Sequence, residues 1–151
     1  MKFAFDVHGV LDSLVEYRDL MRHLHAGGHE IYIISGQPLD EEMKKFLFTS
    51  ELVHCYDNYY SIESYLLEQG VHPFEERQAG KFWSDEIWDP VKAQICKDEG
   101  IDMIFDDSPT YAESFKNVAT HYNLVIDKTK NLTDGRVNPR SCVTAFDDAF
   151  D

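Results

Sequence analysis

Acidic residues in two separate segments of the chain could together bind a metal ion. Asp6 follows a short apolar run near the amino end, and His8 lies two residues further on. Asp106 and Asp107 follow a second apolar run. Such runs are typical of buried strands, and ligands of open α/β sheets bind at the carboxyl ends of the strands. Carboxylates gathered there need a compensating cation, and Mg²⁺ binds through carboxylates together with substrate phosphate, so these segments predict a Mg²⁺ site.

A simpler interpretation exists for the second acidic segment. Asp106, Asp107 and Ser108 stand just before Pro109, and such residues often form a turn or cap the next helix. This alternative applies most readily to Asp107 alone. It applies less well to Asp6 and Asp106 together, because each is expected to end a separate buried strand.

Two further features could contribute to an anion site. Ser35 ends an expected strand and is followed by Gly36, a pattern that suits hydrogen bonding to an anion with help from backbone N–H groups. An ordinary turn serine is the alternative. Lys92 lies in the first turn of an expected helix, where its charge opposes the helix dipole. This position favours contact with an anion or a carboxylate, although a plain surface lysine remains possible.

Strands and helices are expected to alternate along the chain. The pattern predicts a doubly wound, Rossmann-like α/β fold with a mainly parallel sheet of about five strands, helices on both faces and no large cap domain. The expected strands are 2–5, 30–35, 52–56, 102–105 and 119–126. One domain is expected over 1–127, with 128–151 as a C-terminal extension that is short or partly ordered. Residues 71–89 lack periodicity and are expected to form a hairpin or loop whose aromatic residues contribute to substrate selectivity or cover the core.

Composition narrows the classes of partner. The 151 residues carry a formal net charge of −14, which disfavours nucleic acid and anionic membranes. Three widely spaced cysteines without a CxxC pair argue against a zinc or dithiol redox site and fit a reducing cytoplasm. The first 20 residues do not resemble a secretory signal, and no apolar run has transmembrane length. A cytoplasmic protein is therefore expected.

The order of these features resembles the haloacid dehalogenase-like (HAD) superfamily, chiefly its phosphatases, over residues 1 to about 126. The features are the run Asp6-Val7-His8-Gly9-Val10, the pair Ser35-Gly36, Lys92, and the pair Asp106-Asp107. Receiver domains of two-component regulators also carry acidic pairs and a lysine, but their acidic pair follows the first strand, so their order differs.

The resemblance implies a role for each residue. Asp6 would be the nucleophile that forms an aspartyl-phosphate. Ser35 and Gly36 would bind the phosphoryl group, and Lys92 would neutralise its charge, with Lys81 as the alternative lysine. Mg²⁺ would be held by Asp6, Asp106, the backbone carbonyl of His8 and, directly or through water, Asp107.

One position departs from the family pattern. Phosphatases of this superfamily typically carry an aspartate two residues after the nucleophile, as general acid and base, and here that residue is His8. An imidazole titrates near neutrality and can perform the same proton transfers. We therefore hypothesise that His8 is the acid and base; the alternative is an impaired protein that binds metal and phosphate without turnover.

The spacing also bears on the substrate. Between His8 and Ser35 there is room for only one helix and its turns, so no cap domain is expected there. The expected activity is that of a Mg²⁺-dependent phosphoric monoester hydrolase acting on a small phosphorylated substrate, such as a sugar phosphate or mononucleotide. A homo-oligomer that closes the site is possible. A nucleic-acid end phosphatase is the remaining alternative, although the acidic surface disfavours it.

Overall fold

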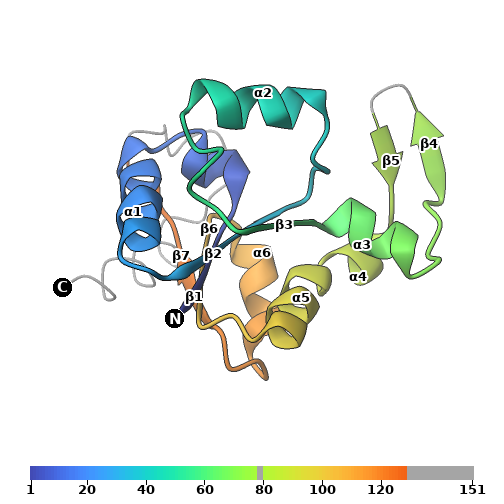
Figure 1. Ribbon diagram of the computed structural model, residues 1–151. Helices are drawn as coiled ribbons and strands as arrows, with labels where there is room; N and C mark the ends of the chain where they lie inside the picture. The colour runs from blue at the N-terminus through green and yellow to red at the C-terminus, as the bar shows by residue number, and fades with distance from the viewer. Residues whose placement is uncertain (78–79, 129–151) are drawn as a thin grey trace.

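The computed structural model describes residues 1–77 and 80–128 and contains a five-stranded parallel sheet (Figure 1). The strand order is β3-β2-β1-β6-β7, with every neighbouring pair parallel. The strands are β1 (Lys2–Phe5), β2 (Glu30–Ser35), β3 (Asn58–Ser61), β6 (Met103–Asp106) and β7 (His121–Leu124). This arrangement confirms the predicted doubly wound α/β fold.

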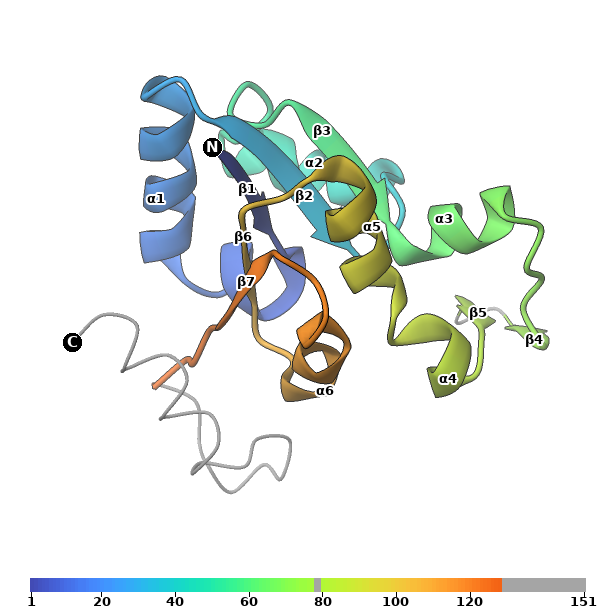
Figure 2. The same cartoon turned by 90° about the horizontal axis from the view of Figure 1, so that it is seen from below.

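Helices cover both faces of the sheet. The helices of the sheet layers are α1 (Val15–Ala26), α2 (Glu41–Thr49), α3 (Ile62–Glu68), α5 (Val91–Glu99) and α6 (Pro109–Ala112), the last continued by a 3-10 turn, Glu113–Phe115. Side chains alternate along β1, so Phe3 and Phe5 join one hydrophobic cluster with α1 and α2, and Ala4 joins the other with α3 and α5. Figure 2 shows α1 on one side of the sheet and α3 and α5 on the other.

The strand predicted at 52–56 was wrong, and β3 lies at Asn58–Ser61 instead. The cause is the way α2 ends. Glu51 adopts a left-handed backbone with φ of 59°, and the Leu52 N–H donates to the Leu47 carbonyl at 2.9 Å. This is the Schellman type of helix end, in which the residue after the left-handed one still belongs to the cap. Leu52 is fully buried, so its apolar character reflects this cap rather than a strand.

The segment 71–89, of which 78–79 lie outside the described residues, lies beside α3 and α5 (Figure 2). It contains the antiparallel pair β4 (Glu75–Arg77) and β5 (Gly80–Phe82), followed by the short helix α4 (Asp85–Trp88). Trp83 is buried in the hydrophobic cluster with α3 and α5, whereas Phe74 is 70% exposed. The aromatic residues of this segment therefore divide between core and surface. The rival site residue Lys81 lies outside the described side chains, and the predicted extension after residue 128 lies outside the described residues.

The part of the chain that the structure describes holds no helix with the length and hydropathy to cross a membrane.

Candidate functional site

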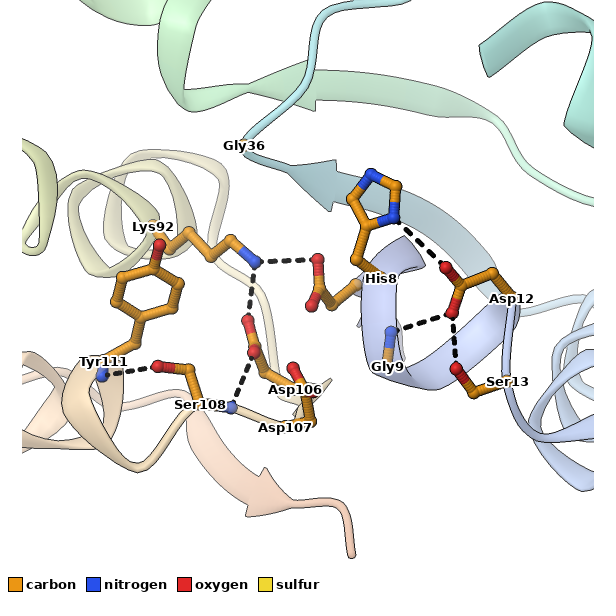
Figure 3. A pocket seen from close by; sticks show the side chains of 11 residues that line it. His8, Gly9, Asp12, Ser13, Gly36, Lys92, Asp106, Asp107, Ser108 and Tyr111 are labelled. Carbon is orange, nitrogen blue, oxygen red and sulfur yellow. Dashed lines mark hydrogen bonds and ion pairs between the residues drawn. The ribbon is translucent and has the colours of Figure 1, made fainter. Parts of the chain in front are cut away.

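A buried lysine joins two of the predicted aspartates at the carboxyl edge of the sheet. Asp6 directly follows β1 and Asp106 ends β6, and these strands are parallel neighbours, so their carboxylates lie at the same edge. Lys92, in the first turn of α5, places its Nζ 3.0 Å from Asp6 Oδ1 and 2.6 Å from Asp106 Oδ2 (Figure 3). All three side chains are buried. The structure thus brings together three residues that the sequence singled out from three distant segments.

Asp107 completes a group of three carboxylates. One carboxylate oxygen each from Asp6, Asp106 and Asp107 lies within 4.8 Å of the others. Lys92 supplies a single positive charge against these acids, so negative charge remains in excess at this point. Hard divalent cations such as Mg²⁺ bind through oxygen ligands of this kind. The donor set therefore fits the cation that the sequence analysis predicted.

The ionisation of this group depends on burial and on mutual charge. Burial raises the pKa of Asp6 to about 8, although Lys92 opposes the shift. Burial alone would lower the pKa of Lys92, but Asp106 and Asp6 outweigh it and raise that pKa above its ordinary value. Lys92 is therefore charged at neutral pH. An added cation would favour the ionised form of Asp6, which is the form able to act as a nucleophile.

Gly9 makes room for the third carboxylate. It lies in the tight turn Val7–Leu11 that follows β1, with a left-handed φ of 86°. A Cβ atom at this position would overlap the Asp107 carboxylate. The glycine is thus needed both for the backbone conformation and for the close approach of Asp107.

We expect Gly9→Ala to weaken Mg²⁺ binding by about 10–100-fold, because the added methyl group displaces a carboxylate of the donor set. Gly28→Ala is the matched control: Gly28 has a φ of 88°, but a Cβ there meets no atom within 4 Å. Both variants should lose about 1–2 kcal/mol of stability through backbone strain. Calorimetric titration with Mg²⁺ checks the difference, and equal affinities in the two variants would contradict the role of Gly9.

Both ring nitrogens of His8 face oxygen atoms at the side of the cavity. Nδ1 lies 3.1 Å from Asp12 Oδ2, and Nε2 lies 2.8 Å from Gln37 Oε1. The hydrogen bond to Asp12 is the main reason that the pKa of His8 is raised to about 9. Burial alone would raise the pKa of Asp12, but hydrogen bonds from His8, Ser13 and Gly9 lower it to about 2. The imidazole is therefore held in its charged form at neutral pH.

In the metal-free protein, we expect the His8 ring to titrate near pH 9 by NMR, and Asp12→Asn to move the midpoint toward the ordinary value near 6.5. The pKa in the folded state exceeds that of the unfolded chain. The stability from this pair is therefore full below about pH 6.5 and is lost as the pH rises through about 9. Because the ring is 59% exposed, the effect on unfolding should be small. A midpoint near 6.5 in both proteins would exclude the ion pair.

These residues surround one open cavity of about 500 Å³. The lining contains six of the predicted site residues, namely Asp6, His8, Gly36, Lys92, Asp106 and Asp107, and five others, namely Gly9, Asp12, Ser13, Ser108 and Tyr111. None of these five was predicted from the sequence to line the cavity. The His8–Asp12 spacing of four residues was the one available signal for Asp12, because a single tight turn brings such residues together.

Ser35 is placed differently from its predicted role. It is fully buried, its Oγ accepts the Gln37 N–H at 3.2 Å, and it is absent from the described lining of the cavity. Its neighbour Gly36 does line the cavity. The hydroxyl thus supports the turn after β2, which is the alternative that the sequence left open.

Tyr111 lines the open cavity beside Lys92 and is held there by Trp88. The Tyr111 ring lies 5.1 Å from Lys92 Nζ, and its hydroxyl accepts the indole N–H of Trp88 at 2.8 Å. Trp88 packs closely over Gly36, where an added Cβ would approach the indole to 3.0 Å. Trp88, at the end of α4, therefore fixes Tyr111 at one side of the site.

Comparison with known proteins adds no relative: no family model, curated protein or solved structure matches the chain. The resemblance to the HAD superfamily therefore stays a prediction from the sequence.

Proposed function

We propose that this protein is a Mg²⁺-dependent phosphoric monoester hydrolase of HAD-like type, which acts through an aspartyl-phosphate on Asp6. The observation that carries the proposal is the buried bridge from Lys92 to Asp6 and Asp106, with Asp107 beside it, in an open cavity. A lysine between a nucleophile and further carboxylates suits the transfer of a dianionic group, because it offsets the repulsion between acid and phosphate. The order of these residues in the sequence supports the same activity.

In the first half of the proposed reaction, an Asp6 oxygen attacks phosphorus and the bond to the ester oxygen breaks. The His8 imidazolium gives its proton to the leaving oxygen, which departs as an alcohol. Lys92 offsets negative charge on the phosphoryl group and on Asp6. Mg²⁺, held by Asp6, Asp106, Asp107 and the His8 carbonyl, would supply further positive charge to the phosphoryl oxygens.

In the second half, water attacks the aspartyl-phosphate and the bond from phosphorus to Asp6 breaks, which restores the carboxylate. The neutral His8 imidazole accepts the proton of the water and becomes the imidazolium again. Protons and charge thus balance over the cycle, with inorganic phosphate and an alcohol as products. One residue serves as acid and then as base.

The cavity favours a small substrate. Its volume of about 500 Å³ suits a sugar phosphate or a mononucleotide, and Gly36 and Lys92 would lie near the phosphoryl group. The net charge of −14 disfavours long nucleic acid. A second subunit that closes the open cavity is compatible with this assignment.

The test is Mg²⁺-dependent release of phosphate from a panel of sugar, nucleotide and aryl monophosphates, with excess chelator as the blank. We expect turnover that requires Mg²⁺. Absence of turnover in folded protein that binds Mg²⁺ would favour a second candidate, a metal- and phosphate-binding protein. The engagement of both His8 nitrogens by Asp12 and Gln37 is the observation in favour of that candidate, because a leaving group must displace Gln37 before it can take the Nε2 hydrogen.

A further inference from the structure

We propose that Gln37 and Asp40 are positioning residues that hold His8 with a hydrogen on Nε2, ready for donation to the leaving group. The inference rests on the proposed function and extends it to two residues outside the lining of the large cavity. It is carried by a continuous chain of hydrogen bonds from the start of α2 to the His8 ring.

The direction of the Gln37 amide follows from its contact with Asp40. The Gln37 nitrogen Nε2 donates to both oxygens of the Asp40 carboxylate, each at 3.0 Å. The reversed amide would set its oxygen against that carboxylate and lose both bonds. The Gln37 oxygen Oε1 must therefore face His8, 2.8 Å from the ring nitrogen Nε2. Because an amide oxygen only accepts, His8 Nε2 must carry the hydrogen.

Asp40 is itself fixed. It is the N-cap of α2, where its Oδ1 accepts the Met43 N–H at 2.8 Å. The backbone of Gln37 is held as well, because its N–H donates to Ser35 Oγ and its carbonyl accepts the Tyr59 hydroxyl at 2.7 Å. The oxygen that faces His8 thus belongs to a loop anchored to β2, β3 and α2. Such anchoring sets the ring orientation with little freedom.

The ring stands between two cavities. His8 and Asp12 line the large cavity, and both also line a smaller one of about 150 Å³ that contains Gln37. With Asp12 on Nδ1 and Gln37 on Nε2, the ring cannot turn without breaking both bonds. A leaving oxygen that enters the large cavity would therefore meet a ring of fixed orientation and compete with Gln37 for the Nε2 hydrogen.

The test compares leaving groups that differ in their need for a proton. Departure of p-nitrophenolate needs little protonation, whereas departure of an alkoxide needs much. We expect Gln37→Met to lower kcat for an alkyl phosphate by about 10–100-fold and kcat for p-nitrophenyl phosphate by less than about threefold. Gln94→Met is the matched control, because Gln94 also donates its amide to an aspartate, Asp98, at 2.7 Å but on the surface of α5. It should leave both rates unchanged.

A double variant provides the rescue. Gln37→Glu combined with Asp40→Asn exchanges the amide and the carboxylate, so that residue 40 donates, residue 37 accepts and an oxygen still faces His8. Asparagine is also as good an N-cap as aspartate. We expect this variant to recover most of the alkyl phosphate rate that Gln37→Met loses.

Each other outcome overturns the inference. Equal losses on both substrates in Gln37→Met would mean that Gln37 is only structural, and a faster alkyl phosphate reaction would mean that it restrains the ring.

A separate measurement needs no turnover: ¹⁵N NMR of the metal-free protein should show a hydrogen on His8 Nε2 that exchanges faster in Gln37→Met. If wild-type protein turns over neither substrate, the proposed function fails and the inference fails with it. If wild-type protein turns over both substrates but Gln37→Met leaves the ratio of their kcat values unchanged, only the inference fails.

Discussion

Asp6→Asn is expected to reduce phosphate release by at least about 10³-fold and to abolish the covalent phosphoenzyme, because an amide cannot serve as the nucleophile. The fold should survive the change. Burial raises the pKa of Asp6 to about 8, which disfavours its ionised form in the metal-free protein, and a neutral amide of the same shape should be tolerated at this position. Steady-state turnover with excess substrate would measure the loss of phosphate release. Rapid acid quench followed by intact mass measurement would show whether the phosphoenzyme is absent.

The matched control for this variant is Asp102→Asn. Asp102 lies just before β6, at the opposite end of the same strand pair, and its carboxylate accepts the Lys2 N–H at 2.8 Å. It has a comparable hydrogen bond but is remote from the cavity, so turnover should be unchanged. If Asp6→Asn kept activity within tenfold of wild type, the nucleophile assignment would be wrong.

Lys92→Met is expected to lower the free energy of unfolding by about 3–5 kcal/mol at neutral pH, because it leaves two buried carboxylates without their cation. Lys92 is only 1% exposed, so solvent cannot replace the lost charge. Without the lysine charge, the pKa values of the Asp6 and Asp106 carboxyls should rise, so the loss of stability should be largest at high pH. Acidification should restore stability as these carboxyls take up protons. Urea denaturation across a pH series measures both effects.

Lys97→Met separates this effect from a general loss of charge on α5. Lys97 lies on the exposed side of the same helix, and its replacement should change stability by no more than about 0.5 kcal/mol. Added Mg²⁺ should stabilise Lys92→Met, because a cation on the carboxylates replaces part of the missing charge. A loss below about 1 kcal/mol in Lys92→Met would mean that the buried carboxyls are neutral without the lysine.

The strand ends were the predictable part of the molecule. An apolar run that stops at a carboxylate predicts both a buried parallel strand and the edge at which the acid lies, so Asp6 and Asp106 could be brought together from sequence alone. Lys92 could be added because a lysine in the first turn of a helix needs a reason to be there. Parallel topology then fixes the meeting point, since the carboxyl ends of neighbouring strands share one edge.

The surroundings of these residues could not be predicted in the same way. Glu51 ends α2 in a left-handed conformation that usually belongs to glycine, so nothing in the local sequence separated the cap at Leu52 from a strand. The partners of His8 depend on side-chain directions across the turn Val7–Leu11 and the loop at Gln37, and no periodicity encodes these directions. Ser35 was given a site role by its position, but burial of its side chain is a property of the packed sheet.

The central place of β1 has a consequence for synthesis on the ribosome. β1 lies between β2 and β6, yet β6 follows β2 only after the whole of 36–102 has been made. At about 5–20 residues per second, the nascent chain spends several seconds with one edge of β1 unpaired. Asp6 then has neither Lys92 nor Asp106 beside it. Affinity for the proposed Mg²⁺ should therefore arise late, when β6 docks, and would report that both edges of β1 are paired.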